Sequence, residues 1–346
     1  PRPPRSAGGP GPAPYAPSGA GRLGAAVAVT LSPYLVQALQ PLTVLVAAPG
    51  LSGWIAKVEA RLQGRRGPRV SQPYHDLVKL FGKESLAPYG ASRFFLAAPV
   101  VAMCCYLTVP LLIPVLTTFG LPLGYAGDII GGSFLLALAS FSVAVAAAES
   151  GSPYAQLGAS RSKTFGAITE PVMLFVVFTV AMITATDLPY AQAAAVRSSG
   201  DQVIRPAHLL ASAALFLVIL YETARIPVET HTGTNEFGMI EEARAFEHSG
   251  PHLALLKWGS AMKQLILCTI LLDVFLAPWG LSSTTGVLSV VLAVGALIGK
   301  TALLGCVVAV IDNSFAKLRL FKISEFVAAA FLLAVLAVFT LYLGGG

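Results

Sequence analysis

The chain has 346 residues, of which 55% are hydrophobic and only 12% carry a charged side chain. Soluble globular domains carry about a quarter charged residues, so this composition excludes an ordinary soluble fold. The net charge of +6 sets the orientation of a membrane protein before it indicates any nucleic-acid partner, and we expect none.

Residues 1–22 are rich in Pro, Gly and Ala and contain no apolar segment. This composition predicts a flexible tail, and the lack of a short apolar stretch with a cleavage site argues against a cleaved signal peptide. Residues 23–346 are predicted to form a single transmembrane domain, because apolar runs of about 18 residues or more recur along them.

These runs predict an all-α polytopic membrane helix bundle with about eight transmembrane helices. The predicted spans are 23–55, 94–118, 130–149, 166–187, 206–223, 261–280, 285–311 and 324–343. The first is longer than a bilayer requires, so we expect it to tilt or to extend into water. Proline interrupts the hydrogen bonds of a helix, and Pro110 and Pro114 are therefore expected to kink the second span.

The basic residues concentrate in four of the connections between these spans. Most of the 23 Lys and Arg residues lie in connections 56–93, 150–165, 224–263 and 312–323. The positive-inside rule places these four connections in the cytoplasm and both termini outside.

Several ionisable side chains fall within the apolar spans or at their edges. A charge near the bilayer centre is costly and usually faces the bundle interior or a hydrated cavity. Glu149, Glu170 and Glu222 lie near the cytoplasmic ends of neighbouring spans, and we expect them to share a hydrated pocket suited to proton loading and release. Lys300 is the deepest charge and requires a partner, for which Asp273 is the candidate.

The third basic connection is unusually rich in ionisable residues. It contains Glu229, Glu236, Glu241, Glu242, Glu247, Arg225, Arg244 and His248. A helix here would place Glu241 and Glu247 beside Arg244, three residues away on either side. His248 and His252 have the spacing of metal ligands, but the intervening Gly-Pro pair would break the helix that aligns them, so we expect no metal site.

No pattern in the chain indicates catalytic chemistry of its own. The four cysteines lie in apolar runs without a CxxC pair, so we expect neither an iron–sulfur nor a zinc site. The sequence also lacks a glycine-rich phosphate loop and a nucleophile motif. We therefore predict that the chain has no catalytic residue, binds no cofactor and leaves any redox centre to other subunits.

The basic connections resemble the cytoplasmic loops of the complex I subunit 1 (H-type) family. The first carries Q-x-R-x-GP from Gln63, followed by Q-P-x-x-D-x-x-K-L-x-x-K-E from Gln72 to Glu84. The second matches at Tyr154, Gly158, Arg161, Glu170 and Pro171. The third matches in the sequences RIPVE and EHSG, and the resemblance covers about residues 30–343.

One segment after the fifth span separates this chain from the quinone-reducing members of that family. Those members read R-x-PFDLPEAExEL, whereas this chain reads RIPVETHTGTNEF, with Thr and Asn in place of two acidic residues and Glu236 nearby. Together with the sequence EHSGP, this makes the chain more similar to the membrane subunit of formate hydrogenlyase or hydrogenase-4, among the group 4 membrane-bound [NiFe] hydrogenases.

The resemblance implies a non-catalytic subunit of the bacterial inner membrane that couples a cytoplasmic redox arm to proton or sodium movement. The implied partners are hydrogenase-like large and small subunits, an iron–sulfur subunit and antiporter-like membrane subunits, with the iron–sulfur clusters and the Ni–Fe centre held by those partners. The implied ion route comprises Glu149, Glu170, Glu222, Glu229, Glu236, Glu241, Glu242, Asp273 and Lys300. The implied arm-docking residues are Arg65, Asp76, Lys79, Lys83, Glu84, Arg161, Arg225, Glu247 and His248.

Three other functions stay open at this point. A quinone-binding subunit of a complex I-type NADH dehydrogenase would need a cavity between the first, sixth and seventh spans that admits a quinone head. A stand-alone secondary transporter would need sites between repeated halves with broken helices, and the sequence shows no such pairing. A structural anchor would need no ion route.

Overall fold

The computed structural model describes residues 31–198, 204–224, 240–314 and 320–343. Within these ranges the regular structure is helical, apart from one isolated bridge between Thr117 and Ser282. In the described part of the chain, seven helices are long and apolar enough to cross a membrane, and α8 (Pro206–Glu222) is apolar but shorter. The predicted all-α bundle of about eight spans is confirmed, whereas the predicted tail at 1–22 lies outside the described residues.

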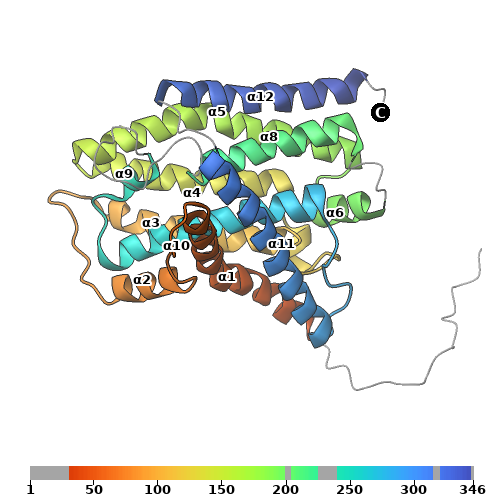
Figure 1. The fold of residues 1–346 in the computed structure, drawn as a ribbon, viewed down its shortest axis with the longest axis horizontal. Coiled ribbons are helices and arrows are strands. Elements are labelled where there is room, and N and C mark those ends of the chain that lie inside the picture. The colour runs from red at the N-terminus through yellow and green to blue at the C-terminus, as the bar shows by residue number, and fades with distance from the viewer. Residues whose placement is uncertain (1–30, 199–203, 225–239, 315–319, 344–346) are drawn as a thin grey trace, which may run out of the picture.

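The long helices carry the spans in chain order. Besides α8 they are α1 (Pro33–Leu62), α3 (Arg93–Leu112), α4 (Ile129–Glu149), α5 (Pro153–Thr184), α10 (Gly250–Thr269) with its π-helical continuation η2 (Ile270–Leu276), α11 (Val287–Ser314) and α12 (Leu320–Leu343). The short helices are α2 (Gln72–Phe81), η1 (Pro122–Tyr125), α6 (Pro189–Ser198) and α9 (Glu241–Ala245). Figure 1 shows α2 and α9 at one end of the bundle, here named the basic end, and α6 at the opposite end.

The helix formed by α10 and η2 is the core of the bundle. Within its apolar stretch of 18 residues, 89% of the residues are buried, compared with 28% in the same length of α11 and 22% in that of α12. It packs against α1 and α3, while α12 covers α5 and α8 on one side and α11 crosses α1 on the other (Figure 1). The apolar side chains that α11 and α12 leave exposed suit lipid or another membrane subunit.

Two predicted connections are largely helical. α5 begins at Pro153, where a proline at the first helical position loses no hydrogen bond, so residues 153–165 extend the fourth span instead of forming a loop. α10 begins at Gly250, so the following residues belong to the sixth span. Hydropathy locates the apolar part of a helix and not its polar ends, which is why it places both starts too late.

Prolines interrupt α1 and shape the bundle around it. Pro49 has no amide hydrogen for the carbonyl of Leu45, and the indole Nε1 of Trp258 donates to that oxygen instead at 2.8 Å. The hydroxyl of Tyr74 donates to the neighbouring carbonyl of Val46 at 2.6 Å. The indole thus replaces the bond that Pro49 cannot make, and the two side chains fix α2 and α10 to the middle of α1. Pro110 lies inside α3, two residues before the helix ends, whereas Pro114 follows it.

Candidate functional site

Glu222 and Lys263 form an ion pair at the basic end of the bundle. Glu222 is the last residue of α8 and Lys263 lies on α10. Only 6% of the lysine side chain and 20% of the glutamate side chain are exposed. At this burial either charge alone would be strongly unfavourable, so the two residues depend on each other.

A second ion pair, between Lys163 and Glu170, lies on α5. Lys163 Nζ is 3.7 Å from Glu170 Oε1, and the two side chains are 33% and 48% exposed. The Lys163 ammonium also lies 4.7 Å from the centroid of the Phe141 ring on α4, within range of a cation–π contact. This pair is therefore more exposed to solvent than the pair of Glu222 and Lys263.

Both pairs line one small pocket between α4, α5, α8 and α10. The pocket has a volume of about 60 Å³ and includes hydroxyl groups of Ser140, Ser162 and Thr169. Polar walls and this volume suit a few ordered water molecules. The structure thus brings Glu170 and Glu222 together, as the sequence predicts. It also places Lys163 and Lys263 beside them, two residues that were not among the predicted site residues. Lys263 could have been found, because it is a charge inside a helix that carries an apolar span.

Glu149 does not line this pocket, which corrects the expectation that it would. Its Oε1 accepts a hydrogen bond of 3.1 Å from the backbone amide of Ser92. Ser92 is the N-cap residue of α3, so the carboxylate lies at the positive end of that helix dipole. Of the other predicted route residues, Glu229 and Glu236 lie outside the described part of the chain, as does the side chain of Glu241.

A larger cavity of about 350 Å³ adjoins the small pocket and shares Ser140, Ala224 and Lys263 with it. Its walls come from α1, α2, α3, α4, α9 and α10. They combine aromatic and ionisable side chains, namely Tyr106, Trp258, Asp76, Glu242 and Arg244. Small-molecule pockets start at about 300 Å³, so this cavity has the size of a ligand site. The first and sixth spans line it as the quinone alternative requires, but α11, the seventh, contributes none of the lining residues that the structure describes.

Arg244 is buried beside this cavity because α9 packs closely on α5. The residue is 4% exposed, and its Nη1 lies 3.4 Å from both the carbonyl and the hydroxyl oxygen of Ser140 on α4. The approach requires glycine at position 158, where a Cβ atom would lie 2.6 Å from the Cβ of Ala243. The helix expected to align Glu247 with Arg244 ends at Ala245, before it reaches that glutamate.

Most predicted docking residues lie on the surface of the basic end. Those exposed are Arg65, Asp76, Lys79, Lys83 and Glu84. Arg161 and Glu247 are half-buried, and Arg225 lies outside the described residues.

His248 differs from the other predicted docking residues because it is packed inside the basic end. It is 4% exposed, and its ring stacks on Phe95 with 4.1 Å between centroids. Burial, with a contribution from nearby His252, lowers the pKa of His248 to about 4. The expectation that its ring is displayed to a partner is therefore corrected.

The first and third basic connections form one continuous surface. The Ser249 hydroxyl accepts from the amide of Leu86 at 2.7 Å and donates to its carbonyl oxygen at 3.0 Å. The Ser85 hydroxyl lies 2.6 Å from Nδ1 of His252. A protein that binds one connection would thus contact the other as well.

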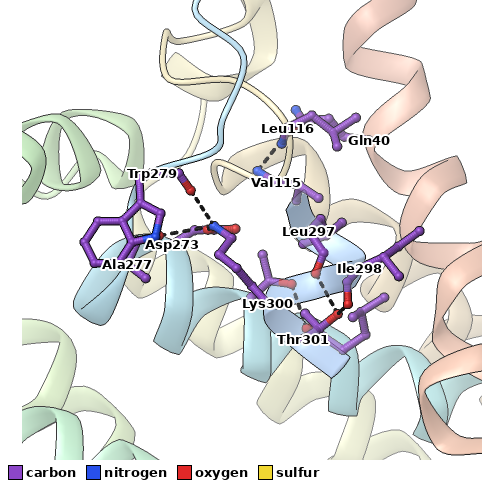
Figure 2. A network of polar contacts seen from close by, with 12 residues as sticks. Gln40, Val115, Leu116, Asp273, Ala277, Trp279, Leu297, Ile298, Lys300 and Thr301 are labelled. Atoms are coloured by element: carbon purple, nitrogen blue, oxygen red, sulfur yellow. Dashed lines mark hydrogen bonds and ion pairs between the residues drawn. The ribbon is translucent and has the colours of Figure 1, made fainter. Parts of the chain in front are cut away.

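Lys300 and Asp273 are in contact near the opposite end of the bundle, and the predicted pairing is confirmed (Figure 2). The lysine comes from α11 and the aspartate from η2. Only 1% of the Asp273 side chain is exposed, compared with 15% of the Lys300 side chain. A deep and separate ion pair thus complements the two pairs at the basic end.

Comparisons with known proteins agree with this architecture. The model of the NADH dehydrogenase family matches residues 35–343. The chain is 32% identical to formate hydrogenlyase subunit 4 of Escherichia coli (strain K12), over 82% of this chain and 90% of that protein. It is 28% identical to hydrogenase-4 component C of the same organism, over 86% of this chain and 92% of that protein. It is 29% identical to the H-type component of NADH-quinone oxidoreductase from Syntrophotalea carbinolica, over 64% of this chain and 70% of that protein.

The fold also matches a solved membrane complex. A chain of the membrane-bound sulfane sulfur reductase, an archaeal respiratory membrane complex, superposes with a TM-score of 0.73 at 22% identity. The match covers 89% of this chain and 100% of that chain. At this identity the likeness establishes the fold alone.

Proposed function

This chain belongs to the NADH dehydrogenase family of complex I subunit 1-like membrane proteins, and we propose that it is the membrane anchor and ion-coupling subunit of a formate hydrogenlyase or hydrogenase-4 type complex. The relatives named for those complexes align along nearly their whole length. The observation that carries the proposal is the polar pocket in which Glu170, Glu222 and Lys263 lie together at the end of the bundle.

The ion route of this proposal begins at the basic end. Glu242 faces the larger cavity, which shares walls with the pocket of Glu170 and Glu222. Paired carboxylates and lysines around a few water molecules can pass a proton without exposing a lone charge to lipid. Glu229, Glu236 and Glu241 belong to the proposed entrance, and Asp273 with Lys300 forms its deep end.

The redox arm would dock on the surface built by the first and third connections. Arg65, Lys79 and Lys83 present exposed positive charge there, and Asp76 and Glu84 present negative charge. Such a mixed surface steers and orients a charged partner. Hydrogenase-like large and small subunits and an iron–sulfur subunit would form the arm and hold the iron–sulfur clusters and the Ni–Fe centre, so that this chain binds no redox centre. Antiporter-like subunits would pack on lipid-facing helices, with the basic end in the cytoplasm of a bacterium and both termini outside.

The first test is purification of the tagged chain in mild detergent, with mass spectrometry of what co-purifies. Recovery of a [NiFe] hydrogenase-like large subunit without NADH-oxidising subunits supports the proposal. Recovery of NADH-oxidising subunits instead contradicts the hydrogenase assignment, and recovery of the chain alone contradicts any anchoring role.

The ion route has its own test in the assembled complex. Glu170→Gln and Glu222→Gln are each expected to lower hydrogen-linked activity at least tenfold, because the amide cannot carry a proton. Purified subunit ratios show whether assembly is intact. A doubly substituted complex that assembles and keeps full coupled activity would show that the chain is a structural anchor without a route through this pocket.

A second candidate function rests on the cavity of about 350 Å³. Tyr106 and Trp258 give it aromatic walls, and Asp76 and Arg244 give it polar groups, a combination that suits a quinone head. A photoreactive quinone that labels peptides containing Tyr106 or Trp258, and that free quinone displaces, would support a quinone-binding role. Labelling spread over the lipid-facing surface of α11 and α12 would argue against it.

A further inference from the structure

Two non-helical segments meet inside the bundle near its opposite end. Residues 113–121 follow α3, and residues 277–286 follow η2. The amide of Thr118 donates to the carbonyl of Ser282 at 2.9 Å, and the amide of Ser282 donates to the carbonyl of Leu116 at 2.7 Å. Leu116 is fully buried and Ser282 is 3% exposed. Irregular backbone at such depth is tolerated only where protein buries it or where it lines a polar site.

Side chains from two helices provide hydrogen-bond partners for the backbone of these segments (Figure 2). Gln40 on α1 is fully buried, and its Oε1 accepts from the amides of Val115 at 3.0 Å and Leu116 at 3.1 Å. Lys300 on α11 instead donates hydrogen bonds, to carbonyl oxygens of the segment that follows η2. Its ammonium donates to the carbonyl oxygens of Ala277 at 3.1 Å and Trp279 at 3.0 Å, and to the carboxylate of Asp273.

The Lys300 ammonium therefore lies within a cluster of oxygen atoms. One carboxylate and two main-chain carbonyls take up all three of its hydrogens. The second oxygen of Asp273, Oδ2, is buried and has no hydrogen-bond partner. An unpaired carboxylate oxygen at this burial is costly, and a cation or water bound to it would offset that cost. Asp273 also lies on a π-helical turn, a distortion that is frequent at functional sites.

We propose that this oxygen cluster is a sodium site, which Lys300 fills with its own ammonium when no sodium is bound. Carboxylates and unwound main-chain carbonyls at interrupted membrane helices are the ligands that secondary transporters present to Na⁺ or H⁺. A sodium ion carries the same charge as the ammonium, so it replaces Lys300 at Asp273 without leaving the carboxylate alone. The more exposed lysine side chain can withdraw, whereas the buried aspartate cannot.

The proposal rests on the proposed function only for the role of the bound ion in coupling. Binding itself depends on Asp273, Ala277, Trp279 and Lys300, none of which lines the pocket of Glu170 and Glu222. If Lys300 only caps the carbonyls at the end of η2, no sodium will bind when the lysine is removed. The two possibilities therefore differ in the amount of sodium that the chain binds when Lys300 is replaced.

The experiment uses the complex that co-purifies with the chain. Binding of radioactive sodium is measured by scintillation proximity for the wild type, Lys300→Met, and the double variant Asp273→Asn/Lys300→Met. We expect Lys300→Met to bind about one sodium ion more per chain than the double variant, with at least tenfold tighter binding than the wild type. Partner subunits contribute equally to all three, so only the differences count.

A thermal measurement keeps the proposal falsifiable if Lys300→Met assembles poorly. In the wild type, sodium chloride is expected to raise the unfolding temperature by a few degrees above choline chloride of equal ionic strength, and Asp273→Asn is expected to abolish that difference. Equal responses to both salts in the wild type would overturn the site, and so would equal sodium binding by the single and double variants. Hydrogen-linked activity of the Glu170 and Glu222 variants is read separately, so failure here is distinguishable from failure of the ion route.

Discussion

Lys263 and Asp273 lie ten residues apart on one continuous helical rod, and each holds one half of an ion pair. At a rise of about 1.5 Å per residue they are about 15 Å apart along the rod. The intervening side chains from Leu265 to Leu272 are at most 8% exposed and mostly apolar. The two pairs are therefore separate sites, and an ion that follows the proposed route has to cross this apolar layer to pass from one to the other.

The first prediction concerns the cost of breaking the ion pair between Glu222 and Lys263. Lys263→Met leaves the Glu222 carboxylate without the Lys263 ammonium, which is expected to destabilise the fold by roughly 3–5 kcal/mol, and adding Glu222→Gln gives a double variant. The double variant removes both charges and is expected to recover most of that loss while coupled activity stays low. Thermal unfolding and the yield of assembled complex measure these effects.

The pair on α5 provides the matched control for that experiment. Because Lys163 and Glu170 are partly exposed, Glu170→Gln is expected to cost about 0–1 kcal/mol. A Lys263→Met protein as stable as Glu170→Gln would contradict the buried pairing of Lys263 with Glu222.

The second prediction concerns the packing of α9 on α5. Gly158→Ala places a methyl group against Ala243, which displaces α9 and with it the buried Arg244. Overpacking of this kind costs typically 1–3 kcal/mol, and we expect a several-fold loss of hydrogen-linked activity. Gly132→Ala on α4 is the control, because a Cβ atom there meets nothing within 4 Å. Equal activity of the two variants would show that the position of Arg244 is unimportant.

The spans and the deep ion pair could be predicted from the sequence, because they depend on apolar runs and on the rarity of charge within them. Lys300 has few possible partners at its depth, and Asp273 is the partner. The surroundings of Glu149 could not be predicted, because its partner, the Ser92 amide, lies 57 residues away and is chosen by the packing of α3 against α4.

The walls of the larger cavity are only partly predictable for the same reason. Hydropathy does not reveal which helices are neighbours. The quinone alternative requires α11 in the lining, whereas α2, α3, α4 and α9 line the cavity alongside α1 and α10. Hydropathy also places Lys263 at the edge of a connection, because α10 begins with polar turns that carry no apolar pattern.

The third prediction follows from the buried ring of His248. Its pKa is about 4 in the folded protein and about 6.5 in the unfolded chain, so between these values only the unfolded state binds the proton. Stability is therefore expected to fall as the pH drops from 6.5 towards 4. His248→Phe keeps a ring against Phe95 and removes the titration, so its unfolding temperature should decline less over this range.

A series of thermal unfolding curves between about pH 7 and pH 4.5 checks the His248 prediction. His75→Phe, a substitution of an exposed histidine on α2, controls for the loss of a histidine as such. Parallel declines in the wild type and in His248→Phe would contradict the assignment of the pH dependence to this ring.

The fourth prediction concerns Gln40, which holds the segment after α3. Gln40→Leu leaves the amides of Val115 and Leu116 buried without an acceptor, at a cost on the order of 3 kcal/mol. Hydrogen exchange measured by mass spectrometry is expected to show faster exchange in the peptide that contains both residues. Gln63→Leu, which alters an exposed glutamine just after α1, should leave that peptide unchanged. Equal exchange in all three proteins would contradict the proposed support.

The unbroken length of α5 has a mechanical consequence. Arg161, at the proposed docking surface, and Glu170, in the small pocket, lie nine residues apart on this one helix, and the turn that Pro171 weakens, from Ala167 to Pro171, contains Glu170. Because α5 continues through this turn, a movement imposed at Arg161 is passed along the helix to the one place where it can bend, beside Glu170. An arm that shifts during its reaction cycle would thus move the Glu170 carboxylate mechanically. This movement would set the timing of the ion step without any charge travelling along α5.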